Sequence, residues 1–287
     1  MRTAWAFPLK YTERNMKSKT YRTEPQGKIK TYAKHLIFII LLVGTLAVNS
    51  ASRSLVESPD IAPNPLRVGE KLTYDISWKK IPAARRTDWI MQKTSMKGED
   101  VYYIHSEMKT RSLFRVYSFQ RHEETYLNPM TLSPVYFRNR LQDQKYRATV
   151  TIDFREETAE YVKLSRPKSK SPERREIKVI EIPVGTQDEL STLYFLRSKE
   201  FELGKTYFFP IITKGKVQKV TLTVERREMV KSKALGRVKT LVLQTSAGDR
   251  FWLTDDARRL PVKAESKIGQ LTVKITLADV EFTKSAD

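Results

Sequence analysis

The densest group of charged side chains in the sequence lies in segment 252–261, where Asp255 and Asp256 are followed by Arg258 and Arg259. Two carboxylates could act as a general acid and base. Neighbouring side chains on a strand point to opposite faces, so both would reach one reacting atom only with help from a turn. The order Thr-Asp-Asp-Ala is typical of a turn, and the arginines can pair with the carboxylates. We interpret the segment as a structural corner, with hydrolysis as the last-ranked alternative.

Other candidate catalytic or metal-binding residues lack the sequence motifs that such sites require. Trp252 and Pro261 flank the corner and are expected to be packing anchors. Ser191 has no Gly-x-Ser-x-Gly elbow around it. His105 and His122 lie in predicted strands, and no spacing selects them for a triad or a metal site. We therefore predict a non-enzymatic protein with no catalytic residue, no metal and no cofactor.

Composition narrows the class of protein further. The 287 residues include 53 Lys and Arg against 33 Asp and Glu, giving a net charge of +20, with three His and no Cys. The missing Cys excludes disulfides, Cys-ligated zinc, a catalytic thiol and an acylated Cys anchor. A charge of this size predicts an anionic partner or a local basic tail.

The N-terminal segments predict export. Residues 1–35 carry nine Lys and Arg against two Glu and are expected to form a basic disordered tail, starting at Met1 or Met16. Residues 36–51 hold the apolar run LIFIILLVGTLAV and then small residues, the pattern of a cleaved signal or an uncleaved signal anchor. A buried helix of a soluble protein is the alternative. The positive-inside rule places the rest of the chain in the periplasm or another extracytoplasmic space, released or anchored to the inner membrane by 36–51.

The elements that position the charged groups are predicted to be strands. Residues 52–65 form a proline-rich linker, and residues 66–282 form one domain, followed by a short tail over 283–287. Apolar and polar residues alternate with period two in about a dozen runs, such as 71–78, 148–154, 220–225 and 271–277. This pattern predicts a mainly β fold, a curled antiparallel sheet or barrel with one polar face.

A single segment, 187–201, has the apolar spacing of a helix and is expected to pack on the sheet. Thr186 and Glu189 stand at the spacing of a capping box, and Asp188 adds negative charge at the helix start. Segment 165–175 holds five Lys and Arg and two prolines, which predicts an exposed loop.

Three segments resemble those of a known family. They are LRVGEKLTY at 66–74, DELSTLYFLR at 188–197 and WLTDDARRLPV at 252–262. In this order they are similar to the exported bacterial proteins grouped as domain-of-unknown-function family 3108, over about 66–282. The resemblance implies an envelope location and a barrel-like antiparallel fold, and it implies no activity. Ala83-Ala84 stands where the family leads us to expect a glycine.

A curled sheet closed by one helix would enclose a concave apolar groove, the usual form of a site for a lipid or another hydrophobic molecule. The residues expected to line or fill this groove are Tyr74, Ile76, Trp78, Tyr103, Phe137 and Phe154. We therefore predict binding of a lipophilic or anionic envelope component, with membrane lipid or anionic glycan as the partner. The alternative is a scaffold that docks a protein partner or cell-wall glycan through its basic face.

Nucleic acid is not the expected partner. Basic and aromatic residues interleave in segments 111–121 and 136–140, as they do in nucleic-acid binders. Export removes the usual nucleic acids, and alternation along aromatic-rich strands produces such neighbours without a binding role.

Overall fold

The computed structural model of the chain describes residues 65–78, 80–111, 118–268 and 271–283. The predicted basic tail (1–35), the signal segment (36–51) and the linker up to residue 64 lie outside the described residues, as do residues 284–287. In the described part of the chain, no helix is long and apolar enough to cross a membrane.

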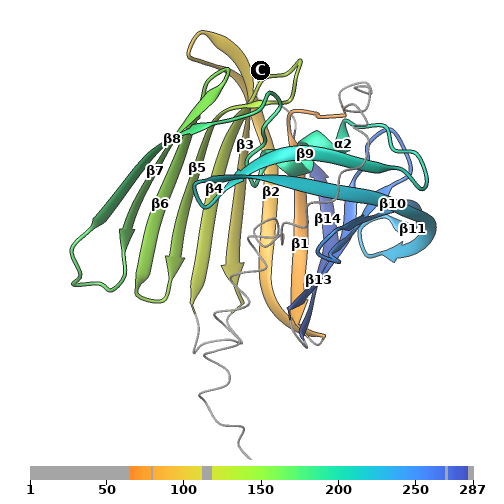
Figure 1. The fold of residues 1–287 in the computed structure, drawn as a ribbon. Coiled ribbons are helices and arrows are strands. Elements are labelled where there is room, and N and C mark those ends of the chain that lie inside the picture. Colours follow the sequence, from red (N-terminus) through yellow and green to blue (C-terminus); the bar gives the residue numbers. More distant parts are fainter. Residues whose placement is uncertain (1–64, 79, 112–117, 269–270, 284–287) are drawn as a thin grey trace, which may run out of the picture.

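The described residues form a mainly β structure with one short helix, as the alternation predicts (Figure 1). The strands are β1 (Glu70–Trp78), β2 (Ile81–Met96), β3 (Glu99–Thr110), β4 (Phe119–Leu127), β5 (Pro134–Asp143), β6 (Tyr146–Phe154), β7 (Thr158–Arg166), β8 (Arg174–Glu181), β9 (Thr206–Thr213), β10 (Lys216–Ser232), β11 (Gly236–Thr245), β12 (Arg250–Thr254), β13 (Pro261–Ile268) and β14 (Leu271–Phe282). The helix, α2, spans Ser191–Arg197.

All fourteen strands belong to one antiparallel sheet. Its order is β8-β7-β6-β5-β4-β3-β2-β1-β14-β13-β12-β11-β10-β9, so the last strand of the chain returns to pair with the first. The strands β8 and β9 are the two edges, and the chain passes from one to the other through α2. Each half of the sheet is a meander of hairpins, which explains the short turns seen in the sequence.

The sheet curls until its two edges approach each other. Gln187, which follows β8, forms a parallel bridge with Ile211 of β9. The amide of Gln187 donates to the carbonyl of Pro210 at 3.0 Å, and the amide of Ile212 donates to the carbonyl of Gln187 at 2.8 Å. In Figure 1, β9 and β10 accordingly pass across the strands β1–β4. These backbone bonds give the barrel-like shape that the sequence predicts.

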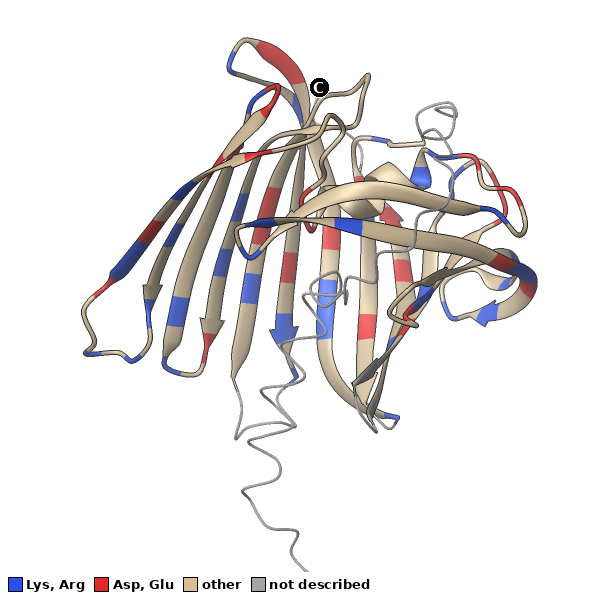
Figure 2. Cartoon of the chain, in the orientation of Figure 1, with Lys and Arg blue, Asp and Glu red and all other residues tan. Residues whose placement is uncertain are grey.

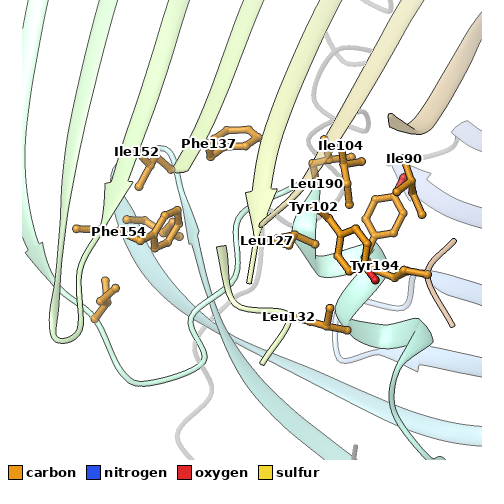
Figure 3. Packing of buried hydrophobic residues seen from close by; sticks show 14 of the residues in the cluster. Ile90, Tyr102, Ile104, Leu127, Leu132, Phe137, Ile152, Phe154, Leu190 and Tyr194 are labelled. Carbon is orange, nitrogen blue, oxygen red and sulfur yellow. The ribbon is translucent and has the colours of Figure 1, made fainter. Parts of the chain in front are cut away.

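The core fills the space between the inner face of the sheet and α2 (Figure 3). Ile90, Ile104 and Leu127 of the sheet pack against Leu190 and Tyr194 at the helix, and all five are buried. Burying one such aliphatic side chain contributes about 1.5–3 kcal/mol. A second cluster, on the side of α2 that faces β9–β12, includes Phe195 and Leu196 of the helix. The helix is thus enclosed by both halves of the sheet.

The helix is shorter than the predicted 187–201, and the predicted capping box is wrong. The Thr186 hydroxyl donates to the carbonyl of Pro183 at 2.6 Å. Asp188 takes the capping role instead, because its Oδ1 accepts from the amides of Leu190 and Ser191, both at 2.7 Å. The bridge between residue 187 and β9 holds the preceding chain extended, so the helix cannot begin earlier.

The predicted loop 165–175 is shortened from both ends. Strand β7 continues to Arg166 and β8 begins at Arg174, which leaves residues 167–173 as the connection. The apolar pattern did not reveal β7, because Val162 and Leu164 point to the outer face while the inner face carries Tyr161 and Lys163.

Candidate functional site

A cavity of about 120 Å³ lies between α2, the inner face of β1–β4 and the strands β12–β14. Its walls are largely apolar: Ile76 of β1, Met108 of β3, Leu193 of α2, Phe251 of β12 and Ile275 of β14. These side chains come from four strands and the helix, so the cavity exists only because the sheet curls. An enclosure of this size accommodates a small apolar group or the end of a longer molecule.

One wall of this cavity is polar. Arg86 and Asp88 of β2 and Glu123 of β4 contribute to the lining, and all three occupy inward positions of their strands. The Arg86 Nε donates to Asp88 Oδ1 at 2.7 Å, and Arg86 Nη1 lies 3.7 Å from Glu123 Oε2. The Asp88 side chain is fully buried, so the ion pair with Arg86 offsets the cost of burying this carboxylate.

Arg121 and Glu189 continue the polar wall toward β9. Arg121 Nη2 lies 2.6 Å from Glu123 Oε1 and also pairs with Glu189 Oε2. The hydroxyl of Thr213, at the end of β9, donates to Glu189 Oε1 at 2.5 Å. A single carboxylate therefore joins β4 to β9 across the interior of the sheet.

The buried polar atoms of the cavity lining that have no hydrogen-bond partner among the described residues include two that a ligand could use. They are Asp88 Oδ2 and the Tyr74 hydroxyl, and both residues line the cavity and are buried. Leaving a buried polar atom unpaired costs about 1–3 kcal/mol. The cavity therefore offers an acceptor and a hydroxyl to a molecule that enters it.

Burial and charge set the ionisation of the wall. Burial raises the pKa of Glu123, against the opposing effect of Arg121 and Arg86. Burial lowers the pKa of Arg86, but Asp88 and Glu123 outweigh it and keep this pKa above its usual value. Three carboxyl groups, on residues 88, 123 and 189, face two guanidinium groups. The wall thus contains one more acidic group than guanidinium groups.

A second cavity, of about 240 Å³, lies on the inner face of β5–β7, beside β9. Phe137, Ile152 and Tyr161 supply aromatic and aliphatic surface, and Lys163 adds a positive charge. Glu189 lines both cavities. The curled sheet therefore encloses two hollows that border the same carboxylate.

Three of the residues expected in the groove do line these cavities. Tyr74 and Ile76 border the smaller cavity, and Phe137 borders the larger one. Phe154 is buried in the apolar core instead. Trp78 is half-buried at the end of β1 and borders neither cavity.

The prediction that Tyr103 faces the groove is wrong. Its neighbours Tyr102 and Ile104 belong to the core, and alternation turns Tyr103 to the outer face. There its ring stacks on Tyr126, with ring centroids 5.0 Å apart. From the sequence, either Tyr102 or Tyr103 could face the interior. The pairing of β3 with its neighbouring strands decides that Tyr102 does.

The corner between β12 and β13 has the hydrogen bonds of a structural turn. Asp256 Oδ1 accepts from the Thr254 hydroxyl at 2.6 Å and from the amides of Arg258 and Arg259 at 3.1 and 3.2 Å. Asp256 Oδ2 pairs with Arg258 Nη2 at 2.9 Å. Burial raises the pKa of Asp256, but Thr254 and Arg258 outweigh it and hold this pKa below its usual value.

The two carboxylates of the corner have separate partners. Asp255 Oδ2 accepts from Arg227 Nε at 2.9 Å and lies 3.6 Å from Lys239 Nζ, while its Oδ1 lies 3.5 Å from Arg259 Nη1. This arrangement confirms the predicted pairing of the arginines with the carboxylates. It leaves neither carboxylate poised beside the other on a shared reacting atom.

The flanks of the corner are packing residues. Trp252 is buried in an apolar cluster, and the Lys263 ammonium lies 3.9 Å from the centre of its ring. Pro261 opens β13 opposite Leu253 and borders the smaller cavity.

Ser191 and the two strand histidines do not form a catalytic arrangement. The Ser191 hydroxyl is buried, accepts from the Asp188 amide at 2.7 Å and donates to the Asp188 carbonyl. His105 and His122 lie side by side on the outer face, with ring centroids 6.2 Å apart. Burial lowers the pKa of His105.

Sequence reasoning missed the polar wall itself. Arg121 and Glu123 occupy the same inward positions of β4 as Phe119 and Leu127, which belong to the core. A charged residue at a position where the alternation predicts an apolar, inward-facing side chain is therefore the sequence feature that indicates such a buried polar wall. Such residues are almost never fully buried unless they are paired, which makes this feature specific.

The fold is similar to that of a solved protein from a family of unknown function. A crystal structure of a β-barrel-like protein of domain-of-unknown-function family 1849 from Brucella abortus matches with a TM-score of 0.50 at 11% identity, over 78% of this chain and all of that one. A protein described as a proposed exported protein from Bacteroides fragilis matches with a TM-score of 0.33 at 6% identity, over 78% and 99% of the two chains. A proposed lipoprotein from Parabacteroides distasonis has a TM-score of 0.29 at 7% identity, over 79% and 100%.

No curated protein matches the sequence. A family model does match it, over residues 73–276, and this range includes the whole of the helix segment and the whole of the corner segment. The model is described as a protein of unknown function, DUF3108. The chain therefore belongs to the DUF3108 family.

Proposed function

We propose that this protein binds a neutral or cationic amphipathic molecule inside its curled sheet and performs no catalysis. The observation that carries the proposal is the pairing of an apolar cavity with two buried polar atoms, Asp88 Oδ2 and the Tyr74 hydroxyl, that lack protein partners among the described residues. A hydroxyl or amide group of a ligand would donate to Asp88 and accept from Tyr74, whereas an ammonium group would donate to Asp88 and to the hydroxyl oxygen of Tyr74. Its apolar part would lie against Ile76, Met108 and Phe251.

The charge of the wall favours this class over anionic lipids. Three carboxyl groups outnumber two guanidinium groups around the cavity. Lys263 also borders the cavity, but its ammonium is paired with Glu265 at 2.9 Å. A carboxylate or phosphate placed next to Asp88 would meet like charge in a site with little water, which is costly.

Binding assays with ligands of one chain length test the proposal. Decanol, decylamine and decanoic acid would compete with the neutral fluorophore N-phenyl-1-naphthylamine. Decanol and decylamine are expected to displace the probe at lower concentration than decanoic acid. Failure of all three to displace it, or preference for the acid, would overturn the proposal.

A matched pair of variants locates the binding. Ala264 lines the cavity, so Ala264→Phe would fill part of it, whereas Ala247→Phe adds the same side chain at an exposed turn. We expect the first variant to weaken displacement by about tenfold, the cost of roughly two lost methylene contacts. The second should bind as the parent does, and circular dichroism would confirm that both are folded.

We also propose that the domain acts outside the cytoplasm. The basic segment followed by the apolar run of residues 36–48 supports this location. An alkaline phosphatase reporter fused after residue 65 is active only when it is exported. Activity of this fusion, and its loss when residues 36–48 are deleted, is the expected result, and an inactive but stable fusion would contradict it.

A further inference from the structure

We propose that the outer face of the sheet carries a second, separate site, which binds a phosphate-bearing molecule. A hollow of about 370 Å³ crosses β4, β5, β6 and β7 on this face. Its lining includes Glu173 and the small polar residues Thr149 and Ser165, and from the strands it includes the long polar side chains of Gln120, His122, Arg140, Gln142, Arg147 and Arg166. These long polar side chains share the outward phase of their strands, so the hollow lies on the opposite side of the sheet from both interior cavities.

Two arginines at the centre of this hollow are placed directly opposite each other. Arg147 of β6 is paired in register with Arg166 of β7. Like charges directly opposite each other on neighbouring strands destabilise a sheet. In the register of β5 with β6, the residue opposite Arg147 is Gln142, which carries no compensating charge.

The positive charge of the pair is largely uncompensated. Among the described residues, Arg147 has neither an ion pair nor a hydrogen bond from its side chain. The ion pair of Arg166 in this part of the chain is to Glu173, at 3.9 Å, the outer limit of such a contact. Because the two guanidinium groups repel each other, an anion that enters between them would be stabilised by both.

Further donors surround the same hollow. His122 and Arg140 are opposite each other on β4 and β5, and Arg140 also pairs with Glu124. Guanidinium groups match the geometry of phosphate oxygens with two parallel hydrogen bonds. Figure 2 shows Lys and Arg recurring along β5–β8, with Asp and Glu between them.

The hollow also has a place for the carbon skeleton attached to the phosphate. Leu164 of β7 borders it, and Thr149, opposite Leu164 on β6, is small enough to leave its floor open. A phosphomonoester, such as a soluble phosphorylated metabolite or the headgroup of phosphatidic acid, has this combination of an anionic group and a carbon chain. The interior cavity has the opposite charge balance, so this site does not depend on the function proposed for it.

The test measures binding of glycerol 3-phosphate by calorimetry and of phosphatidylcholine vesicles, with and without phosphatidic acid, by sedimentation. The parent protein is expected to bind the soluble ligand, the vesicles that contain phosphatidic acid, or both, and the two arms show which source of phosphate is used. Binding of neither would overturn the proposal. In the double variant Arg147→Gln with Arg166→Gln, we expect binding of these ligands to weaken by about tenfold or more, because charge-assisted hydrogen bonds to phosphate are lost.

A second double variant separates this site from the general effect of net charge. Lys231 and Arg237 are also opposite each other, on β10 and β11, and border none of the cavities described above. Lys231→Gln with Arg237→Gln removes the same charge and should leave binding unchanged. Equal loss in both double variants would overturn the proposal, as would full binding by Arg147→Gln with Arg166→Gln. Removing the opposed arginines should not lower thermal stability, so a folding defect is not expected to obscure the result.

Discussion

Arg197, at the end of α2, binds Glu70, at the start of β1, through two parallel hydrogen bonds across 127 residues of sequence. The distances are 2.6 Å from Nη1 to Oε1 and 2.9 Å from Nη2 to Oε2, and both side chains are buried. Arg197 Nε also donates to the carbonyl of Arg258 at 3.2 Å. One guanidinium group therefore joins the first strand, the helix and the corner.

This contact brings together the three separated segments that resemble those of the family. Glu70 belongs to segment 66–74, Arg197 to segment 188–197 and Arg258 to segment 252–262. The two halves of the sheet meet where β1 pairs with β14, and α2 must be fixed relative to that junction. The three segments that resemble those of the family therefore meet at this junction.

Removing one partner of this buried pair should be costly. Arg197→Ala leaves Glu70 buried without its cation, and we expect the free energy of unfolding to fall by about 3–5 kcal/mol. Urea denaturation measures this change. The double variant Glu70→Leu with Arg197→Met replaces both charges with apolar groups and should recover a large part of the loss. A single variant that is as stable as the parent would contradict the assigned role.

Gly69 should tolerate no side chain. Its φ is +86°, and a Cβ at this position would lie 2.0 Å from the carbonyl oxygen of Thr283. Gly98 provides a matched control, because its φ is +82° and a Cβ there meets nothing within 4 Å. We expect Gly98→Ala to cost about 1 kcal/mol from backbone strain alone. Gly69→Ala should cost at least about 1 kcal/mol more because of overpacking. Equal losses of stability would show that the contact with Thr283 is unimportant.

Asp188 should make stability depend on pH near neutrality. Burial raises the pKa of Asp188 to about 7, although Ser191, Thr125 and Leu190 donate hydrogen bonds that oppose the shift. An unfolded Asp titrates near 3.8. Between these values the folded state binds more protons, so the free energy of unfolding should fall as pH rises from about 4 to about 7. Asp188→Asn should remove this part of the slope in denaturation experiments. An unchanged slope would contradict the prediction.

The corner carboxylates should affect stability and not an activity. Asp256→Ala removes the acceptor for two backbone amides and one hydroxyl, and a loss of about 1–2 kcal/mol is expected by analogy with helix caps. Asp100→Ala, at an exposed position near the start of β3, is the matched control and should change little. Thermal unfolding compares the two. If Asp255→Ala with Asp256→Ala abolished a hydrolytic activity without loss of stability, the structural interpretation would be wrong.

Much of the fold follows from local patterns. The alternation around Leu72, Tyr74 and Ile76 predicts a strand with one buried face, and the structure buries all three. The helix was located by its apolar spacing, although its length and cap were not, because both depend on the bridge between Gln187 and Ile211. Strand β7 escaped detection because both of its faces mix apolar and polar residues.

The candidate sites were much less accessible to such reasoning. Tyr103 was assigned to the wrong face, since a pair of tyrosines fits either register until the neighbouring strands fix one. The opposition of Arg147 and Arg166 depends on the register of two strands, which the order of residues does not state.

The sequence by itself determined the class of fold and the family, because these depend on period-two alternation, on a helical spacing and on contiguous motifs. The tertiary structure alone decided which residues meet. Arg86 and Asp88 of β2 meet Glu123 of β4 through the register of neighbouring strands, and Glu189 joins them because the chain leading into α2 lies against the inner face of the sheet. The physical reason is that strand register and curvature are set by many weak pairings along the whole sheet, whereas a binding site depends on a few side chains brought together from distant strands.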